Sequence, residues 1–247
     1  MVIAFCNFKG GVGKTTSVAC IGATLAQKGY KTLLIDLDAQ ANLTSSLTTK
    51  EPERTIYEAM SDGGNLPIVE LSKNFYLTPS DIDLATADLD FAGRQRREYI
   101  IEKLIRPIKK DFDFILLDCP PSLGLLTQNG LTAADKYLIP LTPEALPFKG
   151  LEMLLSAIQS IKDCELNPNL ELLGILMTRI GRKKLNKEVE EFIRNKYTTS
   201  VFSTKIRENV SLAEAPLSGD SIISYAPDSN GAKDYDQVTV ELLSRIK

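Results

Sequence analysis

A short run of glycines and hydroxyl residues carries the clearest chemistry in this sequence. Residues 8–16 read Phe-Lys-Gly-Gly-Val-Gly-Lys-Thr-Thr and lie between an apolar stretch and a segment with helical periodicity. Glycines permit torsions and close approaches that a Cβ would block, so successive N–H groups can point at phosphate oxygens, and the following helix adds its dipole. A phosphate-binding loop is therefore predicted, with nucleotide contacts from Lys9, Gly10, Gly11, Val12, Gly13, Lys14, Thr15 and Thr16.

The loop is a variant of the usual pattern for such sites. Asn7 stands where the first glycine is expected, and Lys9 adds a second lysine to Lys14. Lys14 is expected to reach the β- and γ-phosphates, and the Thr15 hydroxyl to ligate Mg²⁺. The alternative for the segment is a glycine-rich turn that only joins a strand to a helix, and the alternative for Lys9 is an exposed loop lysine.

Three aspartates follow apolar stretches and can complete such a site. Asp118 follows Ile-Leu-Leu, while Asp36 and Asp38 follow Leu-Leu-Ile with the period-two spacing that places both on one side of an extended segment. The chain has no histidine, which excludes imidazole chemistry and leaves a carboxylate to position or deprotonate water. We predict that Asp36 and Asp118 belong to the Mg²⁺ site and that Asp38 is catalytic. The alternative is that these aspartates cap turns.

Composition excludes several other classes of protein. The 247 residues are 43% hydrophobic and 25% charged, which excludes disorder. No apolar run approaches the ~20 residues that a membrane helix needs. Four scattered cysteines without CxxC spacing argue against zinc and against a disulfide framework, and we expect them to be inert. The apolar start runs directly into the glycine loop, so no signal peptide is expected and a cytoplasmic location is predicted.

Alternating elements predict how these residues are positioned. Near-continuous apolar runs suit strands buried on both faces, so we predict a single α/β P-loop domain over 1–247, with a mostly parallel twisted sheet flanked by helices on both faces. The expected strands are Met1–Asn7, Lys31–Asp36, Phe112–Asp118, Lys136–Leu141 and Leu172–Thr178. The expected helices are Thr15–Lys28, Thr86–Ile105, Lys149–Lys162, Lys187–Asn195 and Asp234–Ile246.

The sequence resembles the deviant Walker A ATPases, and within them the ParA/Soj-type partition ATPases. The stretches that carry the resemblance are Lys9–Thr16, Asp36–Asn42, Leu117–Gly124, Leu138–Glu144, Asn209–Pro216 and Tyr225–Tyr235. The resemblance implies ATP and Mg²⁺ as cofactors, a homodimer on ATP binding in which Lys9 reaches the partner's nucleotide, slow hydrolysis positioned by Asp38, and a stimulating ParB-like centromere-binding partner. It also implies nucleotide contacts from Thr178, Ile206 and Arg207.

This sequence departs from the family pattern at several positions. Ala39 and Ala41 replace a frequent Pro and Gly after the catalytic aspartate. Arg207-Glu208 stands where Ile-Pro-Arg-Asn is common, which puts the adenine contact there in doubt. Ser211 occupies a position that is often basic.

The charge is unevenly distributed along the chain. Net charge is −3, but residues 179–207 hold nine Lys/Arg against three Glu. A localised basic face can hold the phosphate backbone without reading sequence, and the resemblance implies non-specific binding of double-stranded DNA here, with an association with the nucleoid. The best candidates are Arg182, Lys183 and Lys184; the alternative is a solvated helical face. The chain starts at the first strand, so no N-terminal helix-turn-helix is expected.

Two other functions stay open at this point. One is a MinD-like or cargo-positioning ATPase that acts on a protein assembly rather than DNA, although the C-terminal segment lacks the basic amphipathic face that a membrane anchor needs. The other is a metabolic P-loop enzyme acting on a small molecule. Lys9 and the basic segment argue against it, because a small-substrate kinase needs neither.

Overall fold

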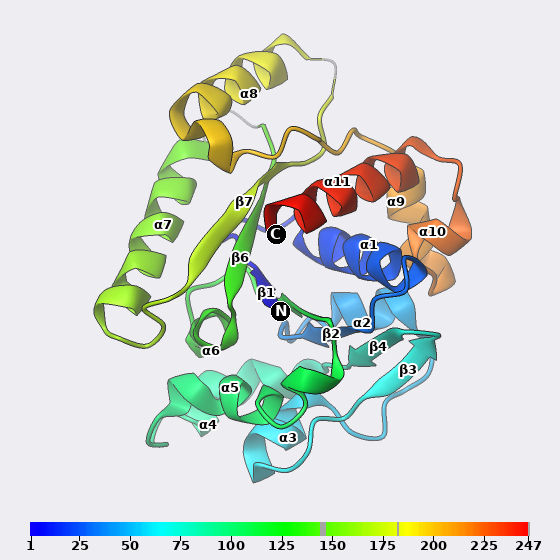
Figure 1. Ribbon diagram of the computed structural model, residues 1–247. Helices are drawn as coiled ribbons and strands as arrows, with labels where there is room; N and C mark the ends of the chain where they lie inside the picture. Colours follow the sequence, from blue (N-terminus) through cyan, green and yellow to red (C-terminus); the bar gives the residue numbers. More distant parts are fainter. Residues whose placement is uncertain (144–146, 182, 247) are drawn as a thin grey trace.

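The computed structural model describes residues 1–143, 147–181 and 183–246. A seven-stranded sheet forms its centre, in the order β3-β4-β2-β5-β1-β6-β7. All neighbours pair in parallel except β3 and β4, which are antiparallel, so the predicted mostly parallel α/β sheet is confirmed (Figure 1). The strands are β1 (Val2–Phe5), β2 (Thr32–Asp36), β3 (Val69–Ser72), β4 (Phe75–Thr78), β5 (Phe114–Asp118), β6 (Lys136–Leu141) and β7 (Glu171–Met177).

Alternate side chains of the central strands enter two separate cores, one on each face of the sheet. In β1, Val2 and Ala4 pack into one core, while Ile3 and Phe5 pack into the other. Every residue of β1, β2 and β5 is buried, which is why these strands read as continuous apolar runs in the sequence.

Helices cover both faces of the sheet (Figure 1). One core is closed by α1 (Lys14–Gln27), α2 (Asn42–Leu47), α9 (Ser211–Glu214), α10 (Ile222–Tyr225) and α11 (Asn230–Ile246). The other is closed by α3 (Ile56–Asp62), α4 (Ala87–Asp90), α5 (Ile100–Ile105), α6 (Leu125–Ala133), α7 (Pro147–Asp163) and α8 (Lys184–Tyr197).

Helix α1 lies very close to the sheet. A Cβ at Gly22 would sit 2.5 Å from a methyl carbon of Leu34, so only glycine allows this approach of α1 to β2. On its other side α1 packs against α11, where the buried Tyr235 hydroxyl lies 3.0 Å from the Ser17 hydroxyl. The C-terminal helix is thus part of the core, and among the described residues no helix is long and apolar enough to cross a membrane.

The single helix predicted over Thr86–Ile105 is wrong. The segment contains α4, a turn, a 3₁₀ turn at Arg97–Tyr99 and then α5. Arg96 has a left-handed φ of 56°, which no helix interior tolerates, and Gly93 lies in the same turn. Polar residues at 93–98 interrupt the apolar pattern, so the helical periodicity on either side belongs to two short helices.

Candidate functional site

The glycine loop leaves the end of β1 and is anchored at its first residue. The Asn7 side chain donates a 2.7 Å hydrogen bond to the Pro140 carbonyl at the end of β6, and its Oδ1 accepts one from the Lys9 N–H at 3.1 Å. The sequence marks Asn7 only as a departure from the usual glycine. In the structure this buried amide fixes the loop to the neighbouring strand.

Two of the three glycines are required by their backbone conformation. Gly11 has φ 73° and Gly13 has φ 82°, both in the left-handed region that favours glycine. Gly13 directly precedes α1, so the loop opens onto the first turn, where Thr15 and Thr16 are half-buried. At Gly10 an added Cβ would meet no described atom within 4 Å, so only an approaching ligand would require glycine at that position.

The two lysines of the loop have opposite environments. Lys14 is 7% exposed and its ammonium group lies 3.3 Å from the Lys9 carbonyl, whereas the Lys9 side chain is exposed to solvent. Burial lowers the pKa of Lys14, with the nearby Asp118 carboxylate acting in the opposite direction. One loop thus presents one cation inside the fold and another outside it.

The residues that follow β7 hold the loop from a third side. The Thr178 hydroxyl donates a 2.8 Å hydrogen bond to the Val12 carbonyl, and the Arg179 guanidinium donates one of 3.1 Å to the Gly11 carbonyl. The family resemblance places Thr178 at the nucleotide, and the structure brings it to the loop. In the sequence Arg179 is only one member of the basic segment, because nothing local marks a contact 168 residues away.

Asp36 and Asp118 end the neighbouring parallel strands β2 and β5 in direct register. Asp36 is fully buried and accepts hydrogen bonds from the Thr44 N–H at 2.9 Å, from the Thr44 hydroxyl at 2.8 Å and from the Asp38 N–H at 3.1 Å. Asp118 is 1% exposed, and neither of its oxygens has a hydrogen-bond partner within the described part of the chain.

Burial dominates the electrostatics of this pair. It raises the pKa of Asp36 to about 6, against the bonds from Thr44. It also raises the pKa of Asp118 well above its usual range, an effect that the Asp36 charge increases and that Thr15 and Lys14 oppose. Two buried carboxylates side by side are costly as anions unless a cation joins them.

The carboxylates therefore fit a hard divalent cation. Mg²⁺ prefers oxygen ligands and usually takes one or two carboxylates together with substrate phosphates and waters. The Asp118 oxygens and the Thr15 hydroxyl offer such ligands, whereas Asp36 is already bonded to Thr44 and suits a supporting position. The predicted metal-side residues thus lie together at the start of α1.

Asp38 lies at the mouth of the site, and hydrogen bonds hold both its backbone and its carboxylate. Its carbonyl accepts a 2.9 Å hydrogen bond from the Ser80 hydroxyl, and its carboxylate accepts one of 3.0 Å from the Gln40 N–H. Ala41, which follows Gln40, has a left-handed φ of 49° just before α2. Sequence reasoning missed Ser80 because it follows β4, a four-residue strand that the apolar pattern does not predict.

The two remaining predicted nucleotide contacts lie in a segment beside β7. Ile206 is 2% exposed and packs in the core under α1 and α11. Arg207 turns its guanidinium to the buried Asp234 of α11, with a 3.0 Å bond from Nε. Its side chain is thus engaged by α11, and its contact with a nucleotide stays a prediction.

Much of the basic segment is neutralised by ion pairs that a count along the sequence does not anticipate. Among the described residues, five of its nine cations have carboxylate partners, two of them supplied from outside the segment by Glu152 of α7 and Asp234 of α11. The pairs are Lys184–Glu188, Arg194–Glu190, Lys205–Glu190, Lys196–Glu152 and Arg207–Asp234. The excess of cations is therefore concentrated near the start of α8.

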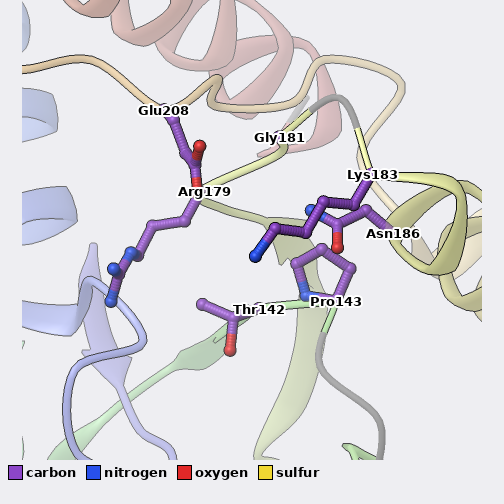
Figure 2. A pocket seen from close by; sticks show the side chains of 7 residues that line it. All are labelled: Thr142, Pro143, Arg179, Gly181, Lys183, Asn186 and Glu208. Atoms are coloured by element: carbon purple, nitrogen blue, oxygen red, sulfur yellow. The ribbon is translucent and has the colours of Figure 1, made fainter.

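Lys183 and Lys184, predicted to bind DNA, lie at that start; Arg182 lies outside the described residues. The side chain of Lys184 is 91% exposed. Lys183 lines a cavity of about 260 Å³ at the carboxyl ends of β6 and β7, and its ammonium group projects over Thr142 and Pro143 (Figure 2). Within the described helix, the first turn of α8 contains no acidic residue, so cations gather where the helix dipole is already positive.

Known proteins resemble this chain over nearly its whole length. Residues 1–172 match the family AAA_31, described as an AAA domain. The chromosome-partitioning ATPase Soj of Treponema pallidum is 39% identical, covering 98% of this chain and 97% of that protein. The sporulation initiation inhibitor protein Soj of Bacillus subtilis is 37% identical with the same coverage.

The fold also matches solved structures. Cobyrinic acid a,c-diamide synthase from Mycobacterium smegmatis, crystallised with ADP and magnesium, superposes with a TM-score of 0.86 at 34% identity over 99% of this chain and 94% of that one. The same protein with an ATP analogue and magnesium gives a TM-score of 0.85.

Proposed function

The chain belongs to the AAA domain family AAA_31 and to the Soj/ParA chromosome-partitioning ATPases, and on that premise we propose that it is an ATP-driven switch for DNA. Its ATPase activity and its use of ATP with Mg²⁺ follow from the family. The finer proposal is that ATP closes two copies into a dimer, that the dimer binds DNA without reading sequence, and that hydrolysis releases it.

The opposite environments of Lys9 and Lys14 carry the dimer proposal. Lys14 is buried under its own loop. We propose that it binds the nucleotide of its own protomer. Lys9 is exposed on the outer side of the same loop. A cation there gains most from a triphosphate in a facing copy, because two protomers enclose the phosphates and exclude the water that would screen the charge.

The start of α8 supports the DNA proposal. Lys183, Lys184 and Lys187 cluster at the positive end of the helix dipole, and the described first turn holds no acidic residue. That arrangement is unfavourable in isolation and becomes favourable when a phosphate backbone lies across it. Two such helix ends on one dimer would bind DNA more tightly than either alone, since the second contact is intramolecular.

Hydrolysis needs a water molecule held in line with the terminal phosphate. Asp38 is half-buried at the mouth of the site, and its backbone is fixed by Ser80 and by the Asp36 carboxylate. We propose that its carboxylate orients this water, while Lys14 and the loop amides stabilise charge on the phosphates. On the basis of the family, we also propose that a ParB-like partner accelerates hydrolysis.

DNA retention in three nucleotide states tests the proposal. Non-specific duplex DNA on a sensor surface should retain the protein with Mg²⁺ and a slowly hydrolysed ATP analogue, and should release it with ADP or without nucleotide. Light scattering on the same samples should show a dimer only with the analogue. Equal retention on DNA in all three nucleotide states would contradict the proposed switch. So would a monomer in light scattering at saturating analogue.

A further inference from the structure

Two consecutive peptide groups of the glycine loop are held from outside by the two residues that follow β7. The Arg179 guanidinium binds the carbonyl of the Gly11–Val12 peptide at 3.1 Å, and the Thr178 hydroxyl binds that of the Val12–Gly13 peptide at 2.8 Å. In Figure 2 the Arg179 side chain leaves the other cavity residues and extends toward the pale blue N-terminal segment.

The contacts of these two carbonyls also fix the direction of the N–H groups in the same peptides. No described peptide bond is cis, and in a trans peptide the N–H points opposite to the C=O. Fixing the Gly11 and Val12 carbonyls toward β7 therefore directs the N–H groups of Val12 and Gly13 away from β7. These are the amides that a phosphate-binding loop presents to its ligand.

The backbone of Arg179 is itself held in an unusual conformation. Its φ is 52°, in the left-handed region that costs a non-glycine residue on the order of 1 kcal/mol. The next residue is fixed on both sides, because the Ile180 N–H donates to the Ile206 carbonyl and the Ile180 carbonyl accepts from the Glu208 N–H. A strained residue whose long cationic side chain reaches one distant carbonyl points to a role in the site.

We propose that Arg179 is a positioning residue for nucleotide binding: its guanidinium locks the Gly11–Val12 peptide so that the loop amides face the phosphates before the nucleotide arrives. The inference rests on the proposed nucleotide site. Arg179 acts through the loop, and its positive charge on the carbonyl side strengthens the amide dipole that faces the phosphates. Without it the loop must become ordered on binding, which weakens affinity.

Arg179→Gly is the decisive variant, because glycine adopts the left-handed backbone without strain. Titration of the full-length protein with a fluorescent ATP analogue and Mg²⁺ should show a Kd about tenfold higher, the size expected from one charge-assisted hydrogen bond. The thermal midpoint should stay unchanged or rise. A merely structural arginine would instead lower the thermal midpoint along with affinity.

Two further variants separate the hydrogen bond from the charge. Arg179→Lys keeps the charge and one donor and should restore affinity to within about threefold of the wild type. Lys196→Met removes a cation near the other end of α8, where Glu152 of α7 already pairs with it, and it should leave the Kd for the analogue unchanged. Equal weakening by Arg179→Gly and Lys196→Met, or an unchanged Kd in Arg179→Gly, overturns the proposal.

Lys14→Ala distinguishes this proposal from the one on which it rests. If Lys14→Ala binds the analogue as the wild type does, the nucleotide site itself is misplaced. If Lys14→Ala loses binding while Arg179→Gly retains it fully, the site stands and only the positioning role fails.

Discussion

The glycine loop and the start of α8 are both cationic, yet they are built in opposite ways. The loop is tied to its neighbours through Asn7, Thr178 and Arg179. Its Lys14 is buried, and so is the nearby Asp118 at the end of β5. The lysines at the start of α8 are exposed, and the ion pair of Lys184 with Glu188 is loose, at 3.6 Å.

The difference follows from what each region has to bind. A triphosphate with a metal ion occupies one defined geometry, so preformed contacts in a dry site contribute most. A DNA backbone can slide along a surface, so exposed and weakly ordered cations are sufficient and their effects are additive and sensitive to salt. A single substitution in the loop should therefore weaken nucleotide binding strongly, whereas each substitution at the start of α8 should weaken DNA binding by a small, additive amount.

The largest effect is expected from removing the buried lysine. Lys14→Ala should raise the Kd for ATP by at least about 100-fold, because two or more charge-assisted bonds to phosphate disappear. Titration with a fluorescent ATP analogue measures this change. Lys9→Ala is the matched control, a lysine on the same loop whose removal should leave nucleotide binding to the monomer nearly unchanged but abolish the dimer.

Asp38→Ala should separate binding from turnover. Hydrolysis should fall by about 100-fold or more, the usual contribution of a residue that positions or deprotonates water. ATP binding should persist, so light scattering should find a long-lived dimer with ATP itself. Wild-type phosphate release by this variant contradicts the catalytic role of Asp38.

Asp36 gives a test that depends on pH. Its pKa is about 6 in the folded protein against 3.8 as the ordinary value, so the unfolded chain loses this proton first as pH rises. Well below pH 3.8 the group is neutral in both states. As pH rises from about 3 to 7, through both pKa values, it lowers the free energy of unfolding by up to about 3 kcal/mol relative to Asp36→Asn, which does not titrate.

Denaturant titrations of both proteins without Mg²⁺ measure this difference. The fixed offset caused by altered bonds to Thr44 is removed by comparing two pH values, one at each end of this range. A difference between the proteins that stays constant from about pH 3 to 7 contradicts the raised pKa of Asp36.

The smallest effect is expected in α8. Lys183→Gln with Lys184→Gln should weaken DNA binding in the ATP state by about tenfold at moderate salt, and should reduce the slope of log K against log salt by about 0.9 for each phosphate that the variant no longer neutralises. Lys196→Gln makes the same kind of change at the other end of the helix, where Glu152 already neutralises the lysine. If each lysine weakens DNA binding equally in both variants, the net charge of the whole basic segment, rather than the cluster at the start of α8, accounts for DNA binding.

Local patterns are sufficient to predict much of the site. Two features are recognisable in the sequence because each directly follows a single predicted strand. They are the Lys-Thr pair after three glycines and the aspartates that follow apolar runs. Parallel strands bring their carboxyl ends to one edge, so Asp36 and Asp118 are expected near the loop, and they lie in direct register. By contrast, sequence reasoning missed β3 and β4 because they are four residues long and β3 is mostly exposed.

The type of fold and the phosphate chemistry can therefore be predicted from the sequence alone, since both depend on neighbouring residues and on the period of apolar side chains. Which cations remain available depends on contacts that form only in the folded chain. Arg207 is bound by Asp234 of α11, Lys196 by Glu152 of α7, and Arg179 by a carbonyl 168 residues away. A count of charges along the chain does not predict these partners, because they are distant in the sequence and folding alone brings them into contact.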